Sequence, residues 1–169
     1  MFVQFSKIGK RFGFPFAEFI QAWTGDLCFI EGGMQKVKER YIETVLDEGA
    51  GEAWMNNPEI AKIISDSLQQ FAGERYDLGA WCVMPNHVHA IISPREGHSL
   101  PDILRSVKRH SALEANRQLS REGEFWQKES YDHLIRDGED YQNQRDYILE
   151  NPKSASLEDW KFVGEGAGR

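Results

Sequence analysis

The sequence predicts an α+β fold, a ferredoxin-like βαββαβ sandwich in which helices cover one face of an antiparallel sheet. Two observations predict this class. Apolar residues alternate with polar ones in some stretches, as in strands, and recur with the helical period in others. These stretches predict the order strand, helices, strand, strand, helix, strand, helix. The chain has 169 residues, of which 40% are hydrophobic, and this is enough for the core of one domain. We therefore expect one domain over residues 1–160 and a flexible tail over 161–169.

The first half of the chain is patterned less clearly than the second. Residues 2–8 alternate weakly and predict the first strand, whereas 10–33 mix aromatic residues with glycine and proline and indicate no element. A helical stripe predicts a helix over 34–46. A second helix is expected from Asn57, a favoured cap followed by proline, to Gly73.

The second half alternates between strand and helix patterns. Two strand runs, 76–83 and 87–93, are separated by a Met-Pro-Asn turn and predict a hairpin. A helix over 99–119 follows, with serine as its cap and proline in its first turn. A short strand is expected over 131–136 and a last helix over 139–150, which the Asn-Pro that follows should end.

The sharpest chemical signal is a pair of histidines, His87 and His89, in the second strand of the hairpin. Alternate residues of a strand face the same way, about 6.5–7 Å apart, so both rings can reach one divalent cation while Val88 points into the core. Imidazole is a common ligand of such cations. The alternative to metal binding is that both histidines are structural, which is the ordinary role of a bare His-x-His pair.

A second signal lies on the last helix. Tyr147 and Asn151 are one helical turn apart on one face, so the phenolic oxygen could reach a substrate held by the metal and the amide oxygen could reach the metal itself. A core aromatic residue and a helix stop before proline are the alternatives, and the spacing leaves them open.

The third signal is the local charge of the helix at 99–121. The whole chain carries a net charge of −7, which by itself disfavours nucleic acid as a partner. This segment nevertheless holds five basic and two acidic residues, and Arg105, Arg109 and Asn116 share a narrow stripe close to Lys108. A basic stripe over an apolar one suits phosphate contacts, with a solvated helix face as the alternative.

Location and redox state follow from what the sequence lacks. No run approaches 18 apolar residues and no signal-peptide pattern begins the chain, so we expect a cytoplasmic protein that does not contact membrane. Cys28 and Cys82 lack the spacing of a metal site and are expected to be core thiols.

Together, four motifs resemble the REP-associated tyrosine transposases, which are single-tyrosine HUH enzymes similar to the small insertion-sequence transposases. The motifs are Trp81-Cys82-Val83-Met84-Pro85-Asn86-His87-Val88-His89, Phe125-Trp126-Gln127, Tyr131-Asp132-His133-Leu134-Ile135-Arg136, and Tyr147-Ile148 with Asn151-Pro152. The resemblance covers about residues 51–152, and residues 1–50 diverge. Ser106-Val107-Lys108 stands where the family often has a Trp-Lys pair.

The resemblance implies a role for each of these residues. His87, His89 and Asn151 would hold a divalent metal, with Mg²⁺ or Mn²⁺ favoured, and Tyr147 on the last helix would be the nucleophile. The substrate would be single-stranded or hairpin DNA, cut through a 5′-phosphotyrosine intermediate by a monomer or homodimer. The basic stripe supplies the expected DNA contacts Arg105, Lys108, Arg109 and Asn116. Arg136 is expected either to contact DNA or to order the last helix, and Trp126 is expected in the core, with base stacking as the alternative.

Two other functions remain open at this point. The chain could be an HUH-type protein that binds or nicks DNA without transposing it. Less favoured is a His-x-His metallohydrolase of small phosphoesters, in which a metal-activated water would replace the tyrosine.

Overall fold

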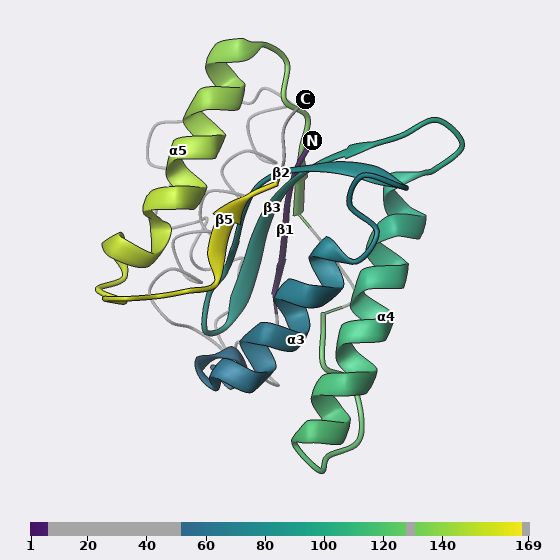
Figure 1. Cartoon of the computed structure of the whole chain (residues 1–169), viewed down its shortest axis with the longest axis vertical. Helices are drawn as coiled ribbons and strands as arrows, with labels where there is room; N and C mark the ends of the chain where they lie inside the picture. Colours follow the sequence, from purple (N-terminus) through teal and green to yellow (C-terminus); the bar gives the residue numbers. More distant parts are fainter. Residues whose placement is uncertain (7–51, 128–130, 167–169) are drawn as a thin grey trace, which may run out of the picture.

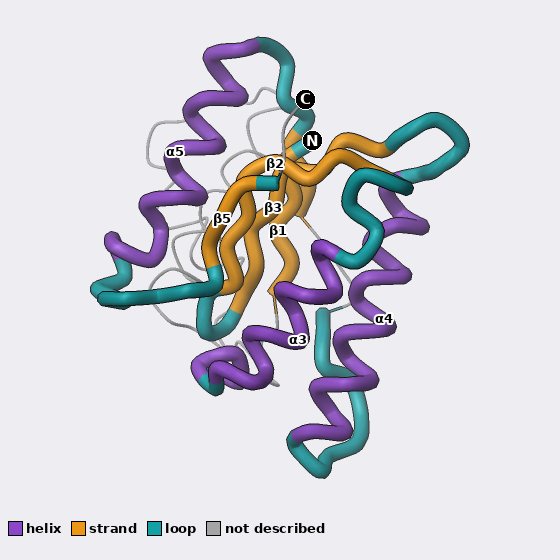
Figure 2. Tube along the Cα trace, viewed as in Figure 1, coloured by secondary structure: helices purple, strands orange, loops and turns teal. Residues whose placement is uncertain are grey.

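The computed structural model describes residues 1–6, 52–127 and 131–166, and these form a sheet with helices on both faces (Figures 1 and 2). The helices are a short 3₁₀ turn η2 (Trp54–Asn56), α3 (Pro58–Gln69), α4 (Leu100–Gln118) and α5 (Gly138–Ser154). The strands are β1 (Phe2–Ser6), β2 (Tyr76–Val83), β3 (His87–Pro94), β4 (Tyr131–His133) and β5 (Val163–Glu165). The expectations for 10–33, for a helix over 34–46 and for Cys28 fall outside the described residues.

The strands lie in the order β4-β1-β3-β2-β5, and every neighbouring pair is antiparallel. Strand β3 is therefore central, with β1 on one side and β2 on the other. Its register places His89 opposite Gln4 on β1 and Cys82 on β2. The α+β, ferredoxin-like prediction is confirmed, and the sheet pins the backbone of the histidine strand from both sides.

The two faces of the sheet are covered by different helices (Figure 1). Val88, Ala90 and Ile92 of β3 share a buried cluster with α3 and α4, as the sandwich with helices on one face predicts. Ile91 instead packs with Ile148 of α5 on the opposite face, so the expectation that the helices cover one face alone is wrong for α5. Because side chains alternate along a strand, His87 and His89 face α5 and not α4.

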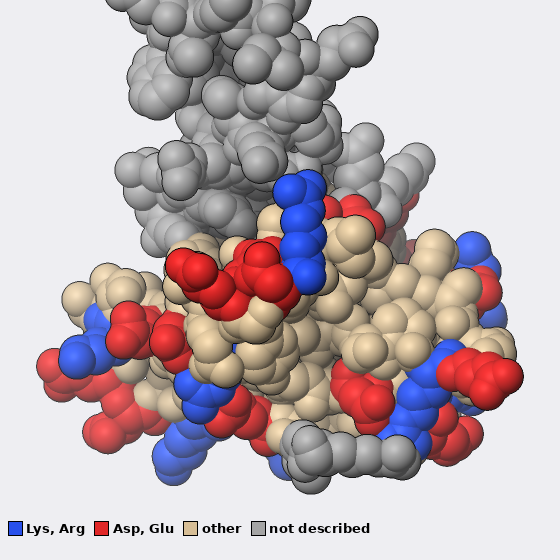
Figure 3. Space-filling model, turned by 90° about the horizontal axis from the view of Figure 1, so that it is seen from above, with Lys and Arg blue, Asp and Glu red and all other residues tan. Residues whose placement is uncertain are grey.

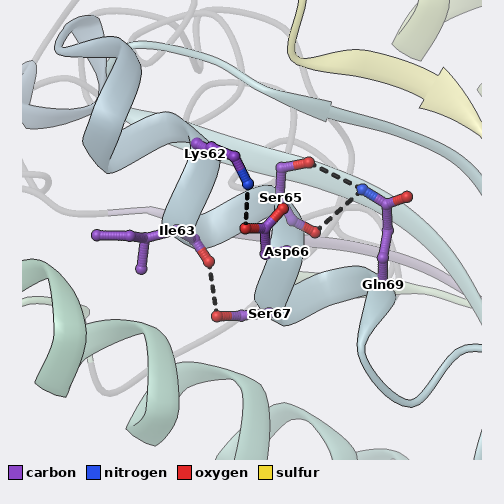
Figure 4. A network of polar contacts seen from close by, with 6 residues as sticks. All are labelled: Lys62, Ile63, Ser65, Asp66, Ser67 and Gln69. Atoms are coloured by element: carbon purple, nitrogen blue, oxygen red, sulfur yellow. Dashed lines mark hydrogen bonds and ion pairs between the residues drawn. The ribbon is translucent and has the colours of Figure 1, made fainter.

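Helix α3 begins and ends on side-chain hydrogen bonds. The Asn57 side chain accepts the backbone N–H of Glu59 at 2.9 Å, as expected of a cap. Near the other end the Tyr76 hydroxyl donates to the Leu68 carbonyl at 2.6 Å, and burial raises the pKa of Tyr76 to about 12. Figure 4 shows the contacts between these ends, which join Lys62 to Asp66, Ser67 to the carbonyl of Ile63, and Gln69 to Ser65.

Helix α5 continues through the Asn-Pro pair that was expected to end it. Pro152 lies inside the helix, which runs on to Ser154. A proline in the final turn removes one backbone donor, but the carbonyls of Asn151 and Pro152 are satisfied: Asn151 accepts from the Ala155 N–H at 3.0 Å and Pro152 from the Leu157 N–H at 2.9 Å. Because Asn151 and Pro152 are also buried, packing outweighs the cost of the proline.

The expected tail over 161–169 is wrong for its first part, because β5 adds an edge strand to β2. Two aromatic residues before it anchor the chain to Val83. The Trp160 indole donates to the Val83 carbonyl at 2.7 Å, and the Phe162 carbonyl accepts the Val83 N–H at 2.8 Å. Three residues of strand carry too little pattern to be recognised locally. Among the described residues, no helix is both long and apolar enough to cross a bilayer.

Candidate active site

The two histidines of β3 converge on one point. The Nε2 atoms of His87 and His89 lie 2.8 Å apart, with ring centroids at 4.5 Å and an interplanar angle of 83°. Neither side chain is exposed. The strand geometry alone would hold the two side chains about 6.5–7 Å apart, so the rings are turned toward each other.

Helix α5 adds the other two expected residues to this pair. The Asn151 amide nitrogen lies 3.4 Å from His89 Nε2, and the Tyr147 ring meets His89 edge to face at a centroid distance of 5.3 Å. Since Tyr147 and Asn151 are one turn apart, one helix presents both to the same imidazole. All four residues implied by the family motifs are thus close together.

The donors in this cluster fit a divalent cation. Two imidazole nitrogens converge, and a half-turn of the Asn151 amide would direct its oxygen toward them, because the two ends of an amide have nearly the same shape. Within residues 1–6, 52–127 and 131–166 there is no group of three or more His, Cys, Asp or Glu side chains placed to hold a metal. The Asn151 amide, 3.4 Å from His89 Nε2, is placed where it could serve as a third protein ligand beside the histidines.

Tyr141, the other tyrosine of α5, lies away from the histidines. Its hydroxyl is 3.4 Å from the position that a Cβ on Gly79 would occupy, and that Cβ would also meet Ile91 at 3.1 Å. Ile91 is the next residue of β3 on this face after His89. Tyr147 is therefore the tyrosine that adjoins the candidate metal ligands.

The residues expected to contact DNA lie apart from this cluster. Helix α4 covers the opposite face of the sheet, and Arg136 follows β4 with an exposed side chain. Arg105 pairs with Asp102 at 2.7 Å, and Asn116 holds the next loop by donating to the Gly123 carbonyl at 2.8 Å. The structure therefore does not bring the expected DNA residues together with the histidines.

Lys108 and its neighbours line a cavity of about 580 Å³ between α4 and residues 123–127. The Lys108 amine donates to the Gln127 carbonyl at 3.1 Å, and burial lowers its pKa to about 8. Arg105 and Arg109 lie on the same wall. Trp126 is a core residue, as expected: it is buried, and its indole donates to the Ser111 hydroxyl at 2.9 Å.

Charge is mixed in sign on one face of the described residues. On the face seen in Figure 3, basic and acidic side chains of the described residues are interspersed.

Two polar contacts that the sequence did not indicate attach α5 to the edges of the sheet: a hydrogen bond at β4 and an ion pair at β5. His133, on β4, lies 2.8 Å from an Asp140 carboxylate oxygen, and its hydrogen bond lowers the pKa of that carboxyl. Arg145 contacts both carboxylate oxygens of Glu165, the last residue of β5, at 2.5 and 3.0 Å. The hydrogen bond from Arg145 likewise lowers the pKa of Glu165.

Asn86 is a further residue to which the sequence assigned no role, and its side-chain oxygen lies 2.7 Å from Nδ1 of His87. The sequence places Asn86 in the turn of the hairpin and in the first family motif, immediately before the first histidine. Both Asn86 and His87 are buried.

A central strand with paired histidines, opposed by a helix-borne tyrosine and asparagine, defines an α+β protein with a candidate metal and nucleophile site. Residues 52–151 match the model of the family described as IS200-like transposases, which is more than half of the chain. The chain belongs to this family.

Individual relatives agree with the family assignment. A Haemophilus influenzae protein assigned as a REP-associated tyrosine transposase is 29% identical over 101 residues, covering 52% of this chain and 57% of the relative. The REP-associated tyrosine transposase of Escherichia coli K12 is 28% identical over 92 residues, covering 52% and 53%. The chain thus spans about half the length of the curated relatives it matches.

A solved structure of a REP-associated tyrosine transposase bound to a REP hairpin has the same fold. The TM-score is 0.53 at 17% identity, over 96% of this chain and 73% of that one.

Proposed function

We propose that this transposase-family chain is a metal-dependent DNA nuclease and strand transferase acting on single-stranded or hairpin DNA in the cytoplasm. The observation that carries the proposal is the cluster in which His87, His89 and Asn151 surround one point beside the Tyr147 ring. Family membership supports transposase chemistry in general. The structural relative is bound to a REP hairpin, which supports hairpin DNA as the proposed substrate of this chain.

In the proposed reaction Tyr147 attacks a backbone phosphorus. Its phenolic oxygen forms a new P–O bond as the bond to the 3′ oxygen breaks, and the proton lost by the phenol is balanced by one gained at the 3′ oxygen. The products are a 5′-phosphotyrosine and a free 3′-hydroxyl. A divalent cation held by His87, His89 and Asn151 would supply positive charge to the non-bridging oxygen. One phosphodiester replaces another, so a 3′-hydroxyl can reverse the step and join strands.

The candidate site is complete within one chain, since β3 supplies the histidines and α5 the tyrosine and asparagine. This supports action by a monomer or by each subunit of a homodimer. Both histidines are buried beneath α5, so we propose that the helix shifts to admit the phosphate. Tyr147 and Asn151 would then move as one body.

The direct test is a covalent adduct. We expect the wild-type protein, incubated with labelled single-stranded hairpin DNA and Mn²⁺, to yield a DNA–protein species that survives denaturation and maps to Tyr147 by peptide mass spectrometry. The same reaction in EDTA is the control and should give none. Cleaved DNA without any adduct would contradict the tyrosine mechanism.

A second expectation concerns Lys108, a proposed DNA contact. Its lowered pKa of about 8 means that the amine is charged at pH 7 and loses its charge as the pH rises through about 8. Hairpin affinity should therefore fall by about 10-fold between pH 7 and 9.5, the worth of one charge-assisted hydrogen bond. Arginine stays charged over this range, so Lys108→Arg should flatten the profile.

Fluorescence anisotropy at constant ionic strength measures this dependence. Lys62→Arg, at an exposed lysine on α3, is the matched control and should keep the wild-type profile. Identical profiles for Lys108→Arg and the wild type would exclude Lys108 as the titrating contact.

A further inference from the structure

Asn86 occupies an unusual place relative to the residue that follows it. Consecutive residues of a strand point to opposite faces, so neighbours within a strand cannot share a side-chain hydrogen bond. Strand β3 begins at His87, which leaves Asn86 in the turn from β2, where the Met84 N–H donates to the His87 carbonyl at 2.8 Å. The turn frees the Asn86 side chain to reach the ring of its own neighbour at 2.7 Å.

The contact bears on which nitrogen of His87 carries the proton. A neutral imidazole has one N–H and one lone pair, and the hydrogen bond at one nitrogen decides the role of the other. When Nδ1–H donates to the Asn86 oxygen, Nε2 keeps a lone pair. That Nε2 atom is the one that lies 2.8 Å from His89 Nε2. In the opposite tautomer Nε2 of His87 would carry the proton and would have to lose it before it could ligate a cation.

We propose that Asn86 is a positioning residue that holds His87 in the Nδ1–H tautomer and so prepares its Nε2 as a ligand. The inference rests on the proposed metal site, but it concerns the metal-free protein as well. Partners of this kind fix the orientation and tautomer of ligating histidines, and their loss weakens metal affinity about 10- to 100-fold. Asn86 is 3% exposed, so water does not readily replace its oxygen.

The competing explanation is that Asn86 serves only the turn, because asparagine is favoured in turns for its own backbone interactions. Two substitutions separate the roles. Asn86→Asp keeps an acceptor at the same position, and Asn86→Ala removes it. Asn57→Ala is the control for a general loss of stability. It removes the cap of α3 on the opposite face of the sheet, which should lower the free energy of unfolding by about 1 kcal/mol without changing the surroundings of His87.

The first measurement is the tautomer of His87 in metal-free protein at pH 8, from long-range ¹⁵N–¹H correlation spectra. We expect Nδ1–H in the wild type, Asn86→Asp and Asn57→Ala, and a shift toward Nε2–H in Asn86→Ala. A wild-type His87 in the Nε2–H form, or an Asn86→Ala protein that keeps Nδ1–H, would overturn the proposal.

The second measurement is Mn²⁺ affinity, from the electron paramagnetic resonance signal of the free ion. Asn86→Ala should bind about 10- to 100-fold more weakly than the wild type, and Asn86→Asp at least as tightly. Wild-type affinity in Asn86→Ala would overturn the proposal. A wild-type protein that binds no Mn²⁺ would contradict the metal site instead, and the tautomer spectra would then decide the role of Asn86.

Discussion

Tyr147→Phe is expected to abolish the covalent adduct and to lower DNA cleavage by roughly 1,000-fold or more, with hairpin affinity within about 2-fold of the wild type. The substitution removes only the phenolic oxygen. The ring that packs edge to face on His89 is retained, so the buried histidine pair should keep its geometry. Denaturing gels for the adduct, single-turnover cleavage and equilibrium binding measure the three quantities separately.

Tyr141→Phe is the matched control for this variant. Tyr141 is on the same helix, is likewise half-buried, and packs in the same cluster against the sheet, but it lies against Gly79. It should form the adduct at the wild-type rate. Undiminished cleavage by Tyr147→Phe would contradict the tyrosine mechanism and favour the metallohydrolase, in which water is the nucleophile.

His87→Ala and His89→Ala are expected to weaken Mn²⁺ binding by about 100-fold or more and to reduce metal-stimulated cleavage to background. Each substitution removes one of the two imidazoles whose Nε2 atoms converge at 2.8 Å, and one imidazole with one amide is a poor set of ligands. Metal binding by calorimetry and cleavage over a Mn²⁺ titration provide independent readouts.

His98→Ala serves as the control, because His98 is exposed in the turn before α4. It should match the wild type in both assays. Circular dichroism and melting in EDTA would identify a variant that is merely unfolded. Cleavage by folded His87→Ala equal to that of the wild type, with Mn²⁺ or Mg²⁺ added, would exclude the assigned metal site.

The sequence predicted those elements whose formation depends on residues close together in the chain. The hairpin follows from two alternating runs around a proline turn, and the structure has it at Tyr76–Val83 and His87–Pro94. Asn57 and Ser99 cap their helices as expected, because each side chain accepts a backbone N–H of the first turn.

The parts that the sequence did not predict depend on distant contacts. β5 is an edge strand because Trp160 and Phe162 fasten the chain to Val83. α5 passes through Pro152 because its last turn is buried. The local pattern of 161–169 does not show the contacts with Val83, and the Asn-Pro pair does not show that the last turn of α5 is buried.

The candidate site, too, was predicted only where it depends on residues close together in the chain. Spacing placed His87 with His89 on one strand face, and Tyr147 with Asn151 on one helix face. It could not bring the two pairs together, because that depends on Ile148 packing against strands far away in the sequence. The role proposed for Asn86 depends on a side-chain rotamer in a turn, which no sequence spacing encodes.

The placement of α4 and α5 on opposite faces of the sheet has an evolutionary consequence. Substitutions at sites that share no partner change the free energy of unfolding additively. A substitution near the α4 cavity should therefore not alter the effect of a substitution around the histidines. On the proposed function, selection could retarget α4 to a different hairpin in small steps. The chemistry beneath α5 would be inherited unchanged.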